Sequence, residues 1–454
     1  MSGGARTVTL VGTGLLAART RTVAAAACVV LAACTTEQTA ETAPPSTSSA
    51  PASSSSPEPS LTEVAERTCN EPLVVTRPHA RGPSRLSLRE ARARSDDGVP
   101  ASEVGPRVRV AVVAGVHPLK HPRAYPLQAD VPCAEGKSRR PRVVTMTLVG
   151  DVMLARGVAT AAGGDLFRPL RATAPRLRRA DVTVGNLESS LSRAGAPTQG
   201  DDSFGADPPA AAALVDAGFD VVSLANNHTG DFGPVALVRT VQRLRAAGLR
   251  TFGAGRDLAA ARRPVVVEVR GTTYGFLGFN AIGETPAAGR GTPGAVRVSM
   301  PPRTGPLDRR ELDRFLRDVR RLDRRVDAVV VMPHWGEQYT HRPWPVQRRV
   351  ARALVRAGAD LVVGGHPHWV QGTSMVGDAV VAHSLGNFVF DMDFSAPAME
   401  GAVLETVWWD GELKAAELVP YRMDASFTPR WLPWPRAREV LAPAARFSGP
   451  AFRF

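Results

Sequence analysis

The sequence predicts an α/β domain over residues 143–394, built from strands that are buried on both faces between helices. Continuous runs rich in β-branched residues recur through this region, a pattern typical of strands covered by helices on both sides. Amphipathic stretches rich in Arg, Leu and Ala alternate with these runs, so helices and strands follow one another along the chain. A third observation, developed below, is that each run ends in polar side chains.

Five runs carry the strand pattern, and three of them are preceded by a helical stretch. The strand-like runs are VVTMTLVGD (143–151), ADVTVGNLE (180–188), FDVVSLANNH (219–228), VDAVVVMPHWG (326–336) and ADLVVGGHPH (359–368). The helical stretches are PAAAALVDAG (209–218), LDRRELDRFLRDVRRL (307–322) and PVQRRVARALVRAG (345–358). Two glycine-punctuated segments, 265–279 and 376–390, predict additional antiparallel strands of the hairpin kind. Strand-like 402–409 and 413–421 belong to a C-terminal segment, 395–454, that ends in a Pro/Arg/Trp-rich tail.

The amino terminus has the layout of a lipoprotein signal peptide over residues 1–33. Arg19 and Arg21 precede an apolar run, 23–33, that is too short to span a bilayer as a helix and ends in small residues before Cys34. The Leu-Ala-Ala-Cys sequence at 31–34 resembles a bacterial lipobox, in which the cysteine becomes the lipidated first residue. We therefore expect an exported protein that is lipid-anchored to the outer face of the cell membrane. An ordinary signal peptide, with Cys34 incidental, is the alternative.

Two further segments separate the signal from the main domain. Residues 34–60 are rich in Ser, Thr and Pro and predict a disordered tether, because they cannot bury apolar surface. Residues 61–140 suggest a small α/β module of uncertain fold, with short strands at 72–76 and 107–115 and a helix at 86–94. Cys69 and Cys133 form an even pair in an exported protein, so a disulfide is expected. A buried and an exposed thiol are the alternative.

Composition narrows the range of partners. Apolar residues make up 44% of the chain, which is enough for a sizeable core. Removal of residues 1–33 deletes three arginines and no acid, which lowers the formal net charge from +13 to +10. A surplus of this size favours anionic partners such as polymers or lipid headgroups. The arginines are nevertheless spread along helices among acids, and export removes nucleic acid as a target, so no nucleic-acid partner is expected.

Each of the five strand-like runs ends in polar groups. In open α/β sheets ligands bind at the carboxyl ends of strands, so we expect these groups to share one site. They are Asp151, Asn186, Glu188, Asn226, Asn227, His228, His334, His366 and His368. Carboxylate oxygen together with imidazole nitrogen suits Mn, Fe or Zn, whereas an all-oxygen set would suit Mg or Ca.

The types of side chain also suggest which residues bind a metal and which one transfers a proton. His366 and His368, at alternate positions of Gly-His-Pro-His, would point to the same side of an extended turn. Asn227 would offer an amide oxygen to a metal, and His228 an imidazole to a leaving oxygen as general acid. Two ions about 3.5–4 Å apart would clamp an in-line phosphoryl displacement. One or two divalent ions are therefore expected. Serine hydrolase chemistry is disfavoured because the Gly-x-Ser-x-Gly elbow is missing.

Six ordered motifs over residues 143–394 resemble the CapA family of capsule and poly-γ-glutamate biosynthesis proteins. They are GDVMLARG, GNLESSLS, LANNHTGDFG, MPHWGEQY, GGHPHWVQG and HSLGNFVFD. This family is a branch of the calcineurin-like metallophosphoesterases, so the resemblance implies a layered α-β-β-α fold in which two sheets pack between helices. It also implies a role in capsule or cell-wall polymer biosynthesis, with membrane synthase subunits as possible partners.

The resemblance assigns roles by motif. Metal ligation falls to Asp151, Asn227, His334, His366 and His368, and catalysis to Asp151, Arg156 and His228. Glu188 is the nearest carboxylate to the place of the expected bridging one, so the alternatives are one metal held by fewer ligands and an altered pair of metals that uses Glu188. Asn186, Asn226, Glu337 and Asn387 would contact substrate. Arg156 and Asn387 have an equal alternative as a structural Arg–carboxylate pair and a turn asparagine. Two departures from the wider superfamily leave the number of metals open, because Met153 stands where a histidine is expected and Asn186 where a carboxylate is expected.

Two functions are compatible with these features. One is a metal-dependent hydrolase or transferase that acts on an envelope polymer. The other is a non-catalytic accessory that binds an anionic polymer such as poly-γ-glutamate and assists its export or anchoring. The basic surplus and the expected lipid anchor favour the second, and the polar strand ends favour the first.

Overall fold

The computed structural model describes residues 73–75, 111–112, 127–129, 142–433 and 436–453. All of the described residues belong to one compact unit. The expected signal peptide, tether, Cys34, Cys69, Cys133 and helix 86–94 lie outside the described residues. The two strands expected near residues 72–76 and 107–115 appear as β1 (Leu73–Val75), which pairs with β3 (Leu127–Ala129), and β2 (Ala111–Val112).

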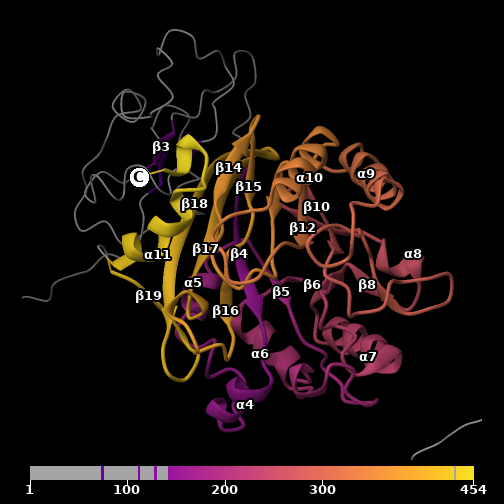
Figure 1. Cartoon of the computed structure of the whole chain (residues 1–454). Coiled ribbons are helices and arrows are strands. Elements are labelled where there is room, and N and C mark those ends of the chain that lie inside the picture. Colours follow the sequence, from indigo (N-terminus) through magenta and orange to yellow (C-terminus); the bar gives the residue numbers. More distant parts are fainter. Residues whose placement is uncertain (1–72, 76–110, 113–126, 130–141, 434–435, 454) are drawn as a thin grey trace, which may run out of the picture. The chain divides into compact units, whose positions relative to one another are not determined.

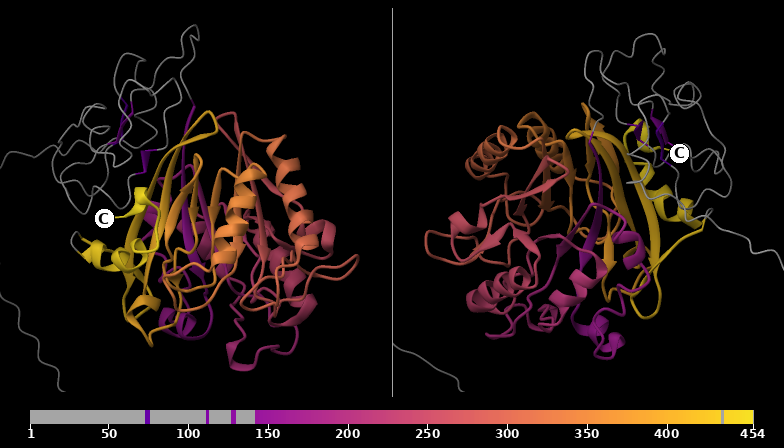
Figure 2. Two further views of the ribbon diagram at one scale, coloured as in Figure 1. Left: turned by 45° about the horizontal axis from the view of Figure 1, so that its top comes forward. Right: turned by 180° about the vertical axis from the view of Figure 1, so that it is seen from behind.

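The first large sheet is built around β4, and its consecutive strands β4, β5, β6 and β7 are parallel, with β7 at the edge. Its strands in spatial order are β19 (Pro429–Trp431), β18 (Glu412–Met423), β17 (Glu400–Trp409), β4 (Val143–Val152), β5 (Val182–Leu187), β6 (Val221–Ser223) and β7 (Arg250–Phe252), with β16 (Asn387–Val389) and β2 also attached. Both views of Figure 2 show the long C-terminal strands β17 and β18, in yellow, beside the purple β4. The C-terminal strands therefore complete the same sheet as the main domain.

The second sheet mixes parallel and antiparallel neighbours. Its order is β14 (Thr373–Val376), β15 (Ala379–Ala382), β13 (Leu361–Val363), β12 (Ala328–His334), β10 (Thr272–Asn280) and β9 (Val265–Val269). β15, β13, β12 and β10 are parallel, and β14 and β9 are antiparallel to their neighbours. A small antiparallel pair joins β8 (Ala254–Gly255) to β11 (Gly294–Ala295). The predicted mixed α/β architecture with parallel strands is confirmed.

Helices cover the outer faces of both sheets. The helices are α4 (Arg156–Ala162), α5 (Ala174–Leu177), α6 (Ala210–Ala217), α7 (Gly233–Ala246), α8 (Leu258–Ala261), α9 (Arg309–Asp323), α10 (Pro345–Arg356) and α11 (Arg436–Ala445), with short 3₁₀ turns at Gly200–Asp202, Ala396–Ala398 and Pro450–Phe452. Among the described residues, none of these helices combines the length and apolar character needed to cross a bilayer. Figure 1 shows α9 and α10 beside β10 and β12.

Three apolar clusters correspond to the spaces between these layers. One lies between the two sheets and joins Met146 and Leu148 of β4 to Phe276 of β10 and Val330 of β12. The outer face of the first sheet packs against α4 to α7, and the outer face of the second packs against α9 and α10. Strands that face apolar layers on both sides need apolar residues at every position, which explains the continuous β-branched runs.

The helix α9 illustrates how local sequence sets these elements. Asp308 caps its amino terminus by accepting hydrogen bonds from the backbone N–H groups of Arg310 and Glu311 at 2.8 and 3.0 Å. Its buried side chains, Leu312, Phe315, Leu316, Val319 and Leu322, repeat at three- and four-residue spacing. The three predicted helices and the five predicted strand runs are all present.

An aspartate stands just before each of four parallel strands, at the amino-end edge of the sheets. Each accepts a backbone N–H from the start of a neighbouring strand, at distances of 2.7 or 2.8 Å. The pairs are Asp181 with Thr145, Asp220 with Thr183, Asp327 with Thr273 and Asp360 with Val329. These bonds satisfy strand donors that have no ladder partner at the edge.

The segment 376–390 matches the sequence-based expectation in part. An antiparallel hairpin forms at its start, where β14 and β15 pair across Gly377 and Asp378, whereas β16 leaves this sheet and runs parallel to β4 in the other one. The chain changes sheet at Gly386, which has a positive φ of 76° and accepts the backbone N–H of Asp151 at 3.0 Å. A Cβ on Gly150 would lie 1.9 Å from the Gly386 oxygen, so the two segments meet at a distance that only glycine permits. The other expected hairpin, 265–279, is confirmed as β9 and β10.

Candidate metal centre

Polar side chains from five strand ends meet where the carboxyl edges of the two sheets face each other. Strand register places Asp151 beside Asn186, and a bridge joins His334 to Gly365. The nine polar strand-end residues are all buried, with between 0 and 6% of their surface exposed. The sequence-based grouping of these residues at one place therefore matches the geometry.

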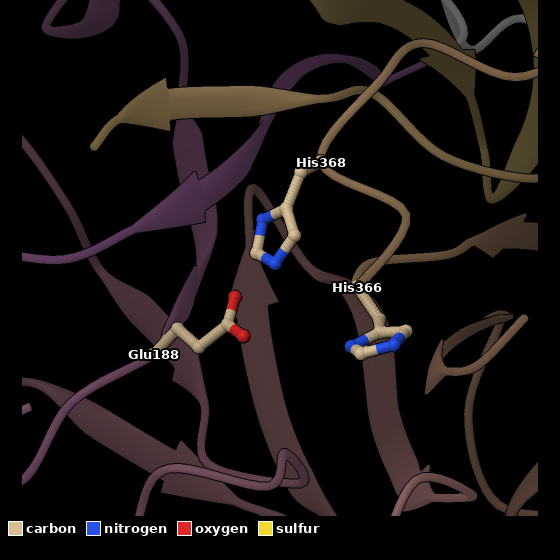
Figure 3. Close-up of side chains that lie close together, drawn as sticks. All are labelled: Glu188, His366 and His368. Atoms are coloured by element: carbon tan, nitrogen blue, oxygen red, sulfur yellow. The ribbon is translucent and has the colours of Figure 1, made fainter. Parts of the chain in front are cut away.

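Two overlapping groups have the spacing of metal ligands. Glu188, His366 and His368 form one group, and Asp151, Glu188 and His334 form the other, with the ligand atoms of each group within 4.8 Å of one another. Figure 3 shows the Glu188 carboxylate pointing towards the two imidazoles, although Glu188 follows β5 and the histidines follow β13. Glu188 belongs to both groups and lies at their centre.

Several of these ligand atoms have no hydrogen-bond partner within the described part of the chain. They are both carboxylate oxygens of Glu188 and both ring nitrogens of His366. The Nε2 atom of His334 lies 3.3 Å from Glu188 Oε1, but its shorter contact, 2.8 Å, is with Asn227 Oδ1. Buried polar atoms are nearly always satisfied. A carboxylate and an imidazole left unsatisfied side by side fit a cation, because a cation satisfies both.

The Gly-His-Pro-His turn is held in a strained conformation against Asp151. His366 and His368 have φ values of 94° and 59°, which side chains rarely adopt. The backbone N–H of His366 donates to Asp151 Oδ2 at 3.0 Å. A Cβ on Gly365 would lie 2.5 Å from Asp151 Oδ1, so glycine is required there. Strain of this kind is typical of functional sites.

Two asparagines brace the cluster from behind. Asn186 donates to Asp151 Oδ1 at 2.8 Å and accepts from Asn226 Nδ2 at 3.0 Å. The Oδ1 of Asn226 accepts from the backbone N–H groups of His228 and Thr229. Both amides, expected to contact substrate, are thus engaged by neighbouring groups in the structure.

Asn387 and Arg156 also brace the site. The Oδ1 of Asn387 lies 2.8 Å from His368 Nδ1, which leaves Nε2 of that ring to face the cluster. Arg156 pairs with Asp391 through two contacts of 2.5 and 3.2 Å, so the structural Arg–carboxylate alternative is present. Glu337 is half-buried, and no hydrogen bond or ion pair within residues 142–433 joins it to the cluster.

His228 is positioned by two contacts that fix its ring. Its Nδ1 lies 2.8 Å from Asp231 Oδ2, and its ring stacks on Phe204 with 3.7 Å between centroids. The Nδ1–H therefore donates to Asp231, and Nε2 faces Glu188 Oε1 at 3.9 Å. Arg156 lies over the Phe204 ring at 4.4 Å. An imidazole held in this tautomer can exchange a proton at Nε2.

Burial favours the neutral forms of five ionisable side chains of the cluster, namely Asp151, Glu188, His334, His366 and His368. Burial raises the pKa of Asp151 to about 7 and that of Glu188 to about 8. The same cause lowers the pKa of His334 to about 4 and that of His368 to about 3. Neutral imidazoles are the form that binds a metal, and a cation held by these residues would favour the deprotonated form of the two carboxyls.

Three residues that contribute to the site were not among those predicted. Asp231 orients His228, Asp391 holds Arg156, and Glu284 accepts from Asn227 Nδ2 at 2.6 Å. Asp231 stands three residues after His228 within the quoted LANNHTGDFG motif, so a search for a histidine-orienting carboxylate would have found it. Glu284 lies on a loop after β10 and has no signal in the sequence.

Met153, which stands where the wider superfamily has a histidine ligand, is fully buried. Its sulfur accepts the backbone N–H of Ala155 at 3.0 Å. The thioether is occupied by the local turn, so this position supports the chain rather than adding a nitrogen ligand.

Comparison with known proteins gives a family. The family model described as Bacterial capsule synthesis protein PGA_cap matches residues 145–392. The Capsule biosynthesis protein CapA of Bacillus anthracis is 32% identical over 57% of this chain and 62% of its own length. The PGA biosynthesis protein CapA of Bacillus subtilis is 31% identical over 57% of this chain and 68% of its own.

A more distant relative is a probable polyglutamine synthesis accessory protein of Mycobacterium tuberculosis, 28% identical over 56% of this chain and 76% of its own. The match spans less than two thirds of the Bacillus anthracis protein. Among solved structures, a hypothetical protein from Thermus thermophilus gives a TM-score of 0.40 at 16% identity, covering 61% of this chain and 99% of that one.

Proposed function

Because this chain belongs to the PGA_cap family of bacterial capsule synthesis proteins, we propose that it takes part in making an envelope polymer through a metal-dependent, phosphoesterase-like site. The polymer class is capsular poly-γ-glutamate or a related cell-wall polymer, as the names of the Bacillus relatives suggest. The arrangement of helices around two sheets is that expected of a metallophosphoesterase-related domain.

The residues at the strand ends would hold one or two divalent ions. The donors are Asp151, Glu188, Asn227, His334, His366 and His368, a mixture of oxygen and nitrogen that suits Mn, Fe or Zn. Glu188 belongs to both ligand groups, so it fits either a single ion or a shared position between two. When bound, such an ion polarises a phosphoryl or carbonyl oxygen and lowers the pKa of a water molecule.

The chain's own residues supply the remaining chemistry. His228 carries a proton at Nε2 when protonated and can donate it to a leaving oxygen, while Asp231 stabilises the charged ring. Asn186 and Asn387 hold Asp151 and His368 in place. Arg156, with 28% of its side chain exposed, lies over Phe204 at the margin of the site and can meet an anionic group of a substrate.

A single observation carries this proposal, namely the unsatisfied and fully buried atoms of Glu188 and His366. A buried carboxylate or imidazole without a hydrogen-bond partner destabilises the fold, because each such group costs about 1–3 kcal/mol of desolvation. A bound cation would satisfy both groups.

Metal analysis of the purified chain tests the proposal. Wild type loaded with Mn, Fe or Zn should retain metal after desalting, whereas Asp151→Ala and His366→Ala should not. Asp327→Asn and His341→Ala provide matched controls at positions outside the cluster, and both should retain wild-type metal content. Absence of bound metal in the wild type, or equal metal in the site variants and the controls, would falsify the proposal.

A non-catalytic role is the second candidate. In this role the chain binds an anionic polymer and assists its export or anchoring, together with membrane synthase subunits. The Arg surplus of the chain supports it, as does the name of the Mycobacterium tuberculosis relative. Metal binding without turnover of generic phosphate esters such as p-nitrophenyl phosphate, together with polymer binding, would favour this candidate over the enzyme.

The location of the protein is part of the same proposal. We infer a lipid anchor at Cys34 on the outer face of the cell membrane from the Leu-Ala-Ala-Cys sequence. In a bacterial host the wild-type chain should partition into detergent on phase separation, and Cys34→Ala should move to the aqueous phase. Equal partitioning of both would rule out the anchor.

A further inference from the structure

We propose that an arginine-lined cleft outside the metal centre binds an acidic polypeptide chain of the polyglutamate type. The cleft has a volume of about 750 Å³ and lies between α8, α9, β10 and the loop after β10. Its basic residues, here called the cleft arginines, are Arg262, Arg263, Arg290, Arg321 and Arg325. Figure 1 shows the positions of α8 and α9, which both contribute residues to the cleft.

The acidic residues in the cleft wall are occupied by structural contacts. Asp318 forms a two-point pair with Arg262 at 2.6 and 2.7 Å and lies 3.7 Å from Arg321. Asp257 caps α8 by accepting the backbone N–H of Ala260 at 2.7 Å. Two carboxylates therefore face five guanidinium groups, and the local charge is positive.

The remaining cleft arginines are free to bind a ligand. Arg263, Arg290 and Arg325 are exposed, and no carboxylate in the described part of the chain lies within ion-pair distance of them. They come from three separate segments, the end of α8, the loop after β10 and the end of α9. Guanidinium groups bind carboxylates through two parallel hydrogen bonds, so three arginines that line one cleft suit a ligand with several carboxylates.

The floor of the cleft is apolar. Leu277 of β10 and Leu322 of α9 line it and are 3 and 2% exposed. A Cβ on Gly275 would lie 2.6 Å from Leu322, so the close packing of helix on strand fixes this floor. The lining contains no aromatic ring on which a base could stack, which disfavours a nucleic acid. In a polyglutamate chain, methylene groups separate the carboxylates, so the methylene groups can pack on the leucines while the carboxylates bind the arginines.

The loop after β10 connects the cleft to the metal centre. Within this loop, Glu284 accepts from Asn227 Nδ2 at 2.6 Å and so holds a candidate metal ligand. Arg290, six residues later, lines the cleft. A chain seated in the cleft thus lies against the same loop that supports the site. The inference rests on the proposed function, because the choice of polyglutamate over other acidic peptides comes from the polymer named for the relatives.

Binding of a labelled, short γ-linked glutamate oligomer to the purified full chain tests the inference. The cleft variant is Arg263→Gln/Arg290→Gln/Arg325→Gln. The matched control is Arg349→Gln/Arg352→Gln/Arg356→Gln, which removes the same charge from exposed positions of α10. We expect the cleft variant to bind about tenfold more weakly or worse at low salt, and the control to change less than about twofold.

Three outcomes would overturn the inference: no binding by wild type at low salt, an equal loss in both variants, or tighter cleft-dependent binding to phosphatidylglycerol vesicles or tripolyphosphate than to the oligomer. Arg290→Gln alone, in an exposed loop, should still weaken binding about threefold if the triple variant does not fold.

Two further measurements of oligomer binding, one in the presence of a chelator and one with Asp151→Ala, separate this inference from the metal proposal. Oligomer binding should persist in both, since the cleft contains none of the metal ligands. Loss of binding with metal removal would place the polymer at the metal centre and overturn the cleft assignment.

Discussion

Acidic residues lie at both the amino-end and the carboxyl-end edges of the two sheets, but they make different contacts there. At the amino end, Asp181, Asp220, Asp327 and Asp360 each accept a backbone N–H of a neighbouring strand. At the carboxyl end, Asp151 is buried and accepts the backbone N–H of His366. Glu188 is also buried, and neither of its carboxylate oxygens has a hydrogen-bond partner among the described residues. The residue type and the place beside a strand are the same at both edges.

The difference shows that a missing hydrogen-bond partner, rather than burial or residue type, sets Glu188 apart from these aspartates. Asp151 is held by Asn186 and by the His366 backbone, and it shares the cluster with Glu188. Asp360 is mostly buried, yet its carboxylate has a fixed backbone donor and serves only to close the sheet. Among the described residues Glu188 has no such donor, and further ligand-type atoms of His366, His368, Asp151 and His334 lie close to it. A buried acid whose partner is missing requires a cation or a proton, and the neighbouring histidines indicate a cation.

The largest effect is expected from Asp151→Ala, at the carboxyl end. Loss of this ligand should weaken metal affinity by about 100-fold or more, beyond the 10–100-fold typical of supporting residues. Because ligand at 100 times its Kd stabilises by about 2.7 kcal/mol, wild type should show a metal-dependent rise in Tm that the variant lacks. Thermal melts with and without Mn or Zn measure this. An equal metal-induced rise in the variant would show that the two edges do not differ in this way.

A supporting residue should matter less than a ligand. Asn186→Ala removes the donor that holds Asp151 Oδ1, and we expect metal affinity to fall about 10–100-fold. Asn280→Ala is the control, because this buried asparagine bonds the backbone of Asn226, Ile282 and Gly283 instead. Calorimetric titration with metal gives both affinities. Similar losses in the two variants would mean that general disruption, rather than support of Asp151, is being measured.

At the amino-end edge a substitution should affect stability and leave metal affinity unchanged. Asp220→Ala leaves the Thr183 backbone N–H without its acceptor at 2.8 Å. We expect the free energy of unfolding to fall by about 1–2 kcal/mol. Denaturant unfolding of metal-free protein measures the first effect and metal titration the second. A change in metal affinity as large as that of Asn186→Ala would contradict the separation of the two edges.

The last expected effect is a change in stability with pH at Asp360, which is seen only when different pH values are compared. Burial raises the pKa of this carboxyl from 3.8 to about 6, although the Val329 N–H opposes the shift. The folded chain therefore binds more protons than the unfolded chain between these values, and this contribution to stability is lost as pH rises through about 6. Asp360→Asn keeps an acceptor for Val329 and removes the titration. Its stability relative to wild type should rise by on the order of 1–2 kcal/mol between pH 4 and 7.

Unfolding curves at several pH values check this last expectation. Asp327→Asn serves as the control, since Asp327 is exposed and accepts from Thr273 in the same way. A gain that is equal in both variants, or that falls as pH rises, would show that burial of Asp360 is not its cause.

Much of the fold could be predicted because it depends on patterns of residues close together in the sequence. The runs around β4, β5, β6, β12 and β13 and the helices α6, α9 and α10 follow from hydrophobic periodicity and from capping residues such as Asp308. The hairpin-like pattern at 376–390 is confirmed for β15, which pairs with β14, but the pattern did not predict that β16 joins the other sheet. No local signal distinguishes a tight turn from a change of sheet at Gly386.

The candidate site was predictable as a set of residues, and its organisation was not. The polar strand endings and the family motifs identified the ligand-type side chains. The roles of Glu284 and Asp391 come from loops whose positions depend on packing. The central place of Glu188, shared by two ligand groups, also depends on how the two sheets face each other.

The sequence by itself determined which strands are buried, where their polar ends lie and which chemical groups stand there, because these depend on neighbours a few residues apart. Only the tertiary structure decided which groups meet, since Asp151 and the backbone of His366 are 215 positions apart and come together through the facing of two sheets. It also decided which of the many arginines converge, in a cleft whose walls come from separate segments. Long-range packing sets these contacts, and a linear pattern of residues does not contain them.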